Sequence, residues 1–208
     1  MTAKETERYG PIFRAVFALS RAAIWGGGAL LIASALMISV DVVIRKFTGV
    51  TLGGADELSS YAFAISTTWA LAYVALHRAN IRVDALYQYF PVRVAAVVDW
   101  LALLGLGIFI GTLSWYAYDV LAVSWLQNSH ANTPLGTPLW IPQAMWFAGL
   151  AWMCFVLVMM LSRATLALLT GDLETVRALC GVRTSQEEAR EEAEAGARIV
   201  QAESEGAR

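Results

Sequence analysis

The chain has 208 residues, of which 58% are hydrophobic and only 15% are charged. A soluble domain of this size would carry about 25% charged residues, so the composition favours lipid over water as the solvent. The formal net charge of −2 provides no basic stripe of the kind that binds nucleic acid, and we therefore expect no nucleic-acid partner.

Four apolar segments predict an all-α integral membrane protein with spans at about residues 22–44, 58–76, 92–126 and 139–169. Each segment is long enough to cross a hydrocarbon core of roughly 30 Å at a rise of about 1.5 Å per residue. The third is longer than a bilayer requires, so we expect tilted helices. Ala33-Ser34-Ala35 resembles a signal-peptide cleavage site, but the apolar sequence continues beyond it to Ile44, which favours a retained span.

Lys and Arg are concentrated before the first span, between the second and third spans, and after the fourth. The other side of the membrane has only Arg45 and Lys46, so the positive-inside rule predicts that both chain ends lie in the cytoplasm. We therefore expect a cytoplasmic segment 1–21, a four-helix transmembrane domain 22–170 and a charged cytoplasmic tail 171–208, which is either a solvated helix or disordered in its last part.

The connection after the second span contains charged and aromatic residues together, among them Arg82 and Asp84. Such a composition is typical of an interfacial segment, so we expect a short amphipathic helix or loop at the cytoplasmic surface.

Carboxylates stand at the ends of the first two spans. Asp41 and Arg45 are four residues apart on one helix face, which suits either an interfacial ion pair or a contact with another subunit. Asp56 and Glu57 open the second span, where the helix N-terminus favours negative charge. We expect these residues to make structural or subunit-interface contacts.

Two further aspartates and both histidines lie too far apart to form sites. Asp99 and Asp119 are separated along one helix by roughly 30 Å, so snorkelling or pairing of Asp99 with a neighbouring subunit is favoured over a proton or cation pathway. His77 and His130 fall on opposite faces of the membrane in this topology, so they cannot ligate one haem iron.

We expect no enzyme activity, no metal site and no cofactor in this chain, because the sequence has no catalytic triad order, metal-ligand cluster or phosphate-binding loop. Small residues within the spans predict close helix packing. These are Gly26, Gly27, Gly28, Gly107 and Gly111.

Short motifs between Asp41 and Pro142 resemble the small membrane subunit, DctQ, of tripartite ATP-independent periplasmic (TRAP) transporters. That family tends to have an Asp and an Arg near the end of the first span, a Glu at the start of the second, and a His-Ile-Arg-Val-Asp string after it. Here the string is Asn80-Ile81-Arg82-Val83-Asp84, so Asn80 replaces the histidine. Pro138-Leu139-Trp140-Ile141-Pro142 is similar to the family's Pro-Trp-Pro pattern.

The resemblance implies a scaffold in the bacterial inner membrane that forms a heterodimer with a large permease subunit. The permease would hold the sodium and organic-acid sites, and a periplasmic binding protein would deliver the substrate transiently. Bound lipids are also compatible with this role. The residues expected to face the binding protein are Arg45, Lys46, Asn128, His130 and Asn132.

Two other functions compete with the scaffold. A membrane anchor of a redox complex would carry haem, which the histidine placement disfavours. An autonomous proton-coupled exporter would use Asp99 or Glu57, and its flux would be abolished by Asp99→Asn or Glu57→Gln.

Overall fold

The structure is a computed structural model that describes residues 10–51, 53–78, 90–181, 193 and 196–197. It confirms the all-α fold, because the part of the chain so described contains helices and no strand beyond an isolated bridge between His130 and Pro138. Arg82, Asp84, the expected interfacial segment and most of the charged tail lie outside the described residues. The helices are α2 (Gly10–Thr48), α3 (Ala55–Leu76), α4 (Val92–Leu126), α5 (Trp140–Thr170) and α6 (Leu173–Cys180).

Three of these helices are long and apolar enough to cross a membrane: Phe13–Thr48 within α2, then α4 and α5. At about 1.5 Å per residue they extend roughly 45–55 Å, well beyond the roughly 30 Å of a hydrocarbon core, so they must tilt or project from it. Large apolar side chains point away from the bundle, as Phe47 at 84% and Leu126 at 82% exposure illustrate. Such a surface suits lipid as its solvent.

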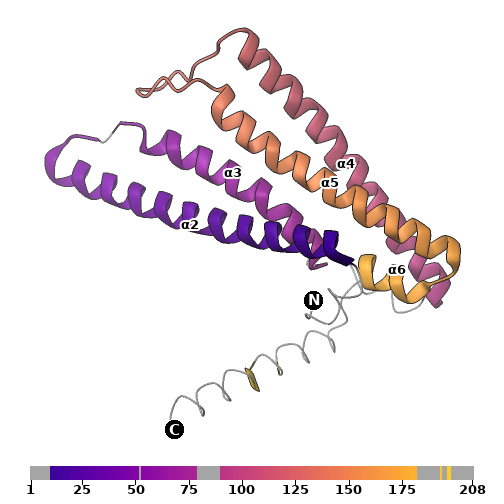
Figure 1. Ribbon diagram of the computed structural model, residues 1–208. Helices are drawn as coiled ribbons and strands as arrows, with labels where there is room; N and C mark the ends of the chain where they lie inside the picture. Colours follow the sequence, from indigo (N-terminus) through magenta and orange to yellow (C-terminus); the bar gives the residue numbers. More distant parts are fainter. Residues whose placement is uncertain (1–9, 52, 79–89, 182–192, 194–195, 198–208) are drawn as a thin grey trace.

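The four long helices form two antiparallel hairpins. α2 packs along α3 in one, α4 packs along α5 in the other, and contacts between α3 and α5 join the two (Figure 1). The hairpins lie close together near α6 and diverge toward the opposite end, where the α4–α5 loop extends back toward the α2–α3 connection (Figure 1). α3 and α5 are therefore the helices that join the two hairpins.

A seven-residue spacing organises the second hairpin. Buried positions of α4 recur at Ala96, Leu103, Ile110, Ala117 and Ser124. Buried positions of α5 recur at the same spacing, at Leu150, Leu157 and Ala164 and at Met153, Met160 and Ala167. This is the repeat by which paired helices interdigitate along a shared seam. Trp100 Nε1 also donates a hydrogen bond to Thr165 Oγ1 (2.9 Å) across it.

α3 carries several hydroxyl side chains within its length. These hydroxyls donate to backbone carbonyls, for example from Ser59 to Ala55 (2.6 Å), from Thr68 to Ala64 (3.0 Å) and from Ser66 to Gly27 of α2 (3.0 Å). Thr68 and Ser66 are buried between the neighbouring helices. The hydroxyls therefore lower the hydropathy of α3 without leaving polar groups unpaired.

α6 is not predicted from the sequence, because all residues after 170 are assigned to the charged tail. Gly171 ends α5 with φ +74°, a conformation that favours glycine. Asp172 then caps α6, its carboxylate accepting from Thr175 N (3.0 Å). Val176 and Leu179 are buried against the α4–α5 hairpin. Glycine followed by a capping aspartate is the signal that could have predicted this helix.

Replacing Asp172 by alanine should loosen α6 without unfolding the bundle, because one helix cap is worth about 0.5–2 kcal/mol. Hydrogen–deuterium exchange should become faster in Leu173–Cys180 while the buried seam of α4 and α5 stays protected. Unchanged exchange in α6 would show that packing alone holds it.

Candidate functional site

Two connections meet at the end of the bundle away from α6: residues 49–54 between α2 and α3, and residues 127–139 between α4 and α5. We call them together the loop cap. Glu57, in the first turn of α3, is only 7% exposed and joins them. Its Oε1 accepts from the Tyr61 hydroxyl (2.8 Å) and its Oε2 accepts from the hydroxyl of Thr133 in the second loop. A buried carboxylate thus ties one hairpin to the other.

Asp41 makes the corresponding contact with the first loop. It is 6% exposed on α2, and its Oδ1 accepts a hydrogen bond from the Thr51 hydroxyl (3.0 Å). The same hydroxyl oxygen accepts from Gly53 N (3.3 Å). The carboxylate near the end of the first span therefore holds the connection into α3, while Arg45 is exposed one turn further along α2.

The two loops also touch through glycine. Gly54 has φ +112°, and a Cβ built there would lie 2.3 Å from Leu135 Cδ1. Gly53, with φ +59°, lies against Pro134 at a distance of 3.8 Å from the position its Cβ would take. A side chain at residue 54 would displace the side chain of Leu135, and the positive φ strains any residue other than glycine, so this contact favours glycine.

The α4–α5 loop has an ordered shape of its own. Ala131 N donates to Thr137 O (2.9 Å) and Leu139 N donates to Ser129 O (3.0 Å), so the loop folds back as a narrow ribbon. His130 Nδ1 is 2.7 Å from Asn128 O. All of the residues expected to face a binding protein are exposed here or at the end of α2: Arg45, Lys46, Asn128, His130 and Asn132. Such a surface can recognise a partner by charge and hydrogen bonds.

Asp99, far from the loop cap on α4, is 1% exposed and takes part in an interaction within the chain. Its carboxyl lies inside the bundle, which leaves little surface for another subunit to contact. Asp119 is exposed toward the other end of the same helix, so the structure does not bring the two together. Asp56 is exposed beside the buried Glu57.

The histidines lie at opposite ends of the bundle. His77 follows α3, with its ring stacked on Tyr73 at 3.9 Å between centroids and edge-on to Phe17 at 5.4 Å. His130 is in the loop cap, beside the start of α3. The geometry therefore does not place the two imidazoles on one haem iron. The described residues also contain no group of three or more His, Cys, Asp or Glu side chains suited to a metal ion.

Glycines mark where the helices approach most closely. A Cβ on Gly27 would lie 3.3 Å from Ser66 Cα, so this residue sets the spacing of α2 and α3. The other predicted packing glycines have no neighbouring atom within 4 Å of such a Cβ: Gly26, Gly28, Gly107 and Gly111. α5 packs tightly on Thr68 and Trp69 of α3 at Gly149. The sequence does not single out this residue, since an isolated glycine in an apolar run carries no motif.

The match to a protein family decides the identity of the chain. The family model described as tripartite ATP-independent periplasmic transporters, DctQ component, matches residues 34–167. The chain belongs to the DctQ family. The searches against curated proteins and solved structures gave no match. The family resemblance expected from the sequence is thus confirmed, and this DctQ protein is a membrane-embedded component of a TRAP transporter. The matched region includes Asp41 and Glu57, the two carboxylates that bind the loop cap.

Proposed function

We propose that this DctQ protein is a fixed scaffold that braces a large permease subunit in the bacterial inner membrane. The permease would carry out sodium-coupled uptake of a small organic acid delivered by a periplasmic binding protein. The observation that carries the proposal is the use of buried polar groups: Asp41 and Glu57 fasten the protein's own loops, while its outward surface is apolar. This arrangement suits a rigid body with a wide lipid- or protein-facing surface.

Four crossings with both ends in the cytoplasm are part of this proposal. α3 has 22 residues, about 33 Å at the usual rise, and it lies between α2 and α5 with its hydroxyls bonded. Ser66 and Thr68 are buried against the neighbouring helices, and the exposed Thr67 donates to a carbonyl of its own helix. These hydroxyls are therefore compatible with a membrane-spanning α3. The distribution of Lys and Arg supports an orientation with the α6 end in the cytoplasm and the loop cap in the periplasm.

In that orientation the loop cap is the surface that an arriving binding protein would meet. Arg45 and Lys46 supply exposed cations beside it, and Asn128, His130 and Asn132 supply hydrogen-bonding groups. The permease, in turn, would cover part of the apolar helix surface. The substrate and sodium sites belong to that subunit in this proposal.

Affinity purification from native membranes in mild detergent should recover a large polytopic permease with this chain at close to one to one. Liposomes containing the pair, supplied with the binding protein and a sodium gradient, should take up substrate, and liposomes containing the small chain alone should not. An unrelated four-span protein with the same tag is the control for recovery.

Three outcomes would overturn the proposal that this chain is a scaffold. Flux from this chain alone that is lost in Asp99→Asn or Glu57→Gln would identify an exporter. A haem absorbance band in the purified complex would identify a redox anchor. Recovery of the chain without any permease would show that it has no permease to brace.

A further inference from the structure

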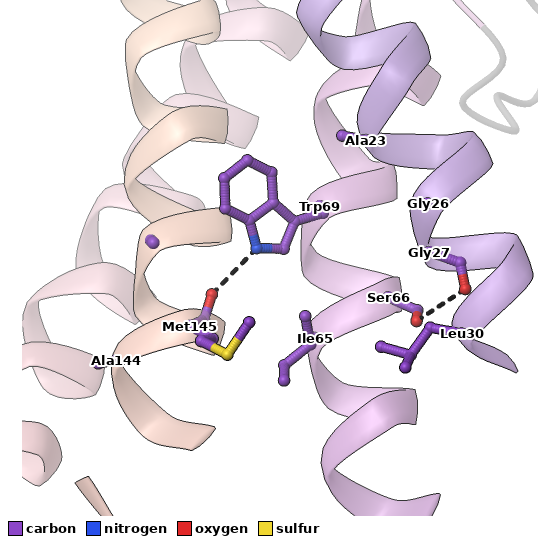
Figure 2. A pocket seen from close by; sticks show the side chains of 10 residues that line it. Ala23, Gly26, Gly27, Leu30, Ile65, Ser66, Trp69, Ala144 and Met145 are labelled. Carbon is purple, nitrogen blue, oxygen red and sulfur yellow. Dashed lines mark hydrogen bonds between the residues drawn. The ribbon is translucent and has the colours of Figure 1, made fainter. Parts of the chain in front are cut away.

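A hollow of about 420 Å³ separates α2 from α5 near the middle of the bundle. α3 forms its floor, and α2 and α5 form its walls (Figure 2). Apart from Leu30 and Met145, the walls are made of glycine and alanine, which is why the two helices do not fill the space between them. Its lining includes Gly26, Gly27, Ser66, Trp69, Ala144 and Met145.

Contacts within the chain lie at both ends of this hollow. At the α6 end, Trp152 Nε1 donates to Ser20 Oγ (3.1 Å) and links α5 directly to α2. At the other end, the bond from Thr133 to Glu57 holds the α4–α5 loop over the start of α3. The remaining access is sideways, between α2 and α5, from the medium that surrounds the helices.

The chemistry of the lining favours a hydrocarbon. The hydroxyl of Ser66 donates to Gly27 O (3.0 Å), and the indole of Trp69 donates to Met145 O (3.0 Å), as Figure 2 shows. Both polar side chains of the lining are therefore already paired within the chain. A water molecule needs two to four polar partners to be held in a cavity, and this lining does not offer them.

The size of the hollow excludes a helix of a partner protein as its occupant. A helix with side chains is about 10 Å across, so a volume of this size would hold only about one turn of it. A helix could lie over the hollow but not within it. A flexible alkyl chain, by contrast, can enter sideways from the bilayer and follow the wall between α2 and α5.

We propose that this hollow holds an acyl chain of a bilayer phospholipid as a fixed part of the structure. The chain replaces the bulk that α2 and α5 lack at Gly26, Ala144 and Ala148, and so keeps the two hairpins at their observed separation. The inference requires a membrane-embedded protein but not the scaffold role, and it goes beyond that role.

Native mass spectrometry of the purified complex tests the proposal, with palmitoyl-oleoyl phosphatidylethanolamine titrated into delipidated samples. Gly26→Leu should fill the hollow, because Gly26 lines it and a Cβ there would meet no atom of the protein within 4 Å. We expect the fraction of protein that retains one phospholipid to fall about tenfold. Gly28→Leu is the matched control, since Gly28 is also unobstructed on α2 but does not line the hollow.

Ala148→Leu adds the same bulk from the opposite wall and should have the same effect if Gly26→Leu fails to fold. Equal phospholipid retention in wild type, Gly26→Leu and Ala148→Leu would overturn the proposal. So would a wild-type complex that retains no phospholipid, or variants that lose the permease while keeping the lipid, because a side chain of the permease would then be the occupant. Lipid loss with the permease still bound supports the proposal whether or not the scaffold function is correct.

Discussion

Replacing Gly149 by leucine should separate the two hairpins and produce the largest loss of stability of any single change in the bundle. A Cβ at this position would lie 2.6 Å from Thr68 Oγ1 and 3.0 Å from Trp69 Cδ1. Inserting a few methylenes into a close-packed contact costs about 1–3 kcal/mol, and a whole leucine side chain between two helix backbones should reach or exceed the upper limit. We expect a lower midpoint of thermal unfolding in detergent and poor recovery of monodisperse protein.

Gly111→Leu is the matched control for this prediction. It also places leucine at a helical glycine, but the position has no neighbouring atom within 4 Å in the chain. Its thermal midpoint should stay at the wild-type value. If Gly149→Leu were as stable as Gly111→Leu, the contact between α3 and α5 would not be the one that holds the hairpins together.

Replacing Glu57 by alanine should release the α4–α5 loop from α3. The change removes the acceptor for two hydroxyls, those of Tyr61 and Thr133. Hydrogen bonds to a charged group are worth about 1.5–3 kcal/mol, so amide exchange in residues 127–139 should accelerate by one to two orders of magnitude. If the loop cap receives the binding protein, uptake by the complete transporter should fall as well, with permease recovery unchanged.

Asp56→Ala provides the control, because Asp56 is the adjacent carboxylate on the same turn and is exposed. Its exchange and uptake should resemble those of the wild type. If amide exchange in residues 127–139 stayed as slow in Glu57→Ala as in the wild type, the loop's own backbone hydrogen bonds, such as Ala131 N to Thr137 O, would be sufficient to hold the loop.

Apolar runs and helix-breaking residues were enough to predict the four long helices but not α6. The expected spans agree closely with α4 and α5, because Pro91 and the Pro138–Pro142 segment mark where each begins. α2 starts well before the predicted residue 22, because Phe13 and Val16 are buried in the core and stabilise the added turns by packing. α3 has the expected end at Leu76, although its hydroxyls place it below the hydropathy of the other three.

The candidate site was only partly predictable. Glu57 and Asp41 were selected as polar contacts, but their partners Thr133 and Thr51 were not, because a hydroxyl in a loop has many alternatives until the fold brings one carboxylate to it. The Glu57–Thr133 bond joins residues 76 apart in sequence. Gly149 was missed for the same reason, since only the packed structure shows which glycine faces another helix.

The same separation in sequence affects how the protein is made. The bonds that join α3 to the second hairpin, from Trp69 to Met145 and from Thr133 to Glu57, each span 76 residues. At a synthesis rate of about 5–20 residues per second, the partners of α3 are synthesised roughly 4–15 s after α3 itself. During that interval the first hairpin already exists, but the surface that Gly149 will cover stays open. The half-made chain is therefore most vulnerable to degradation or wrong association at α3, before α5 is complete.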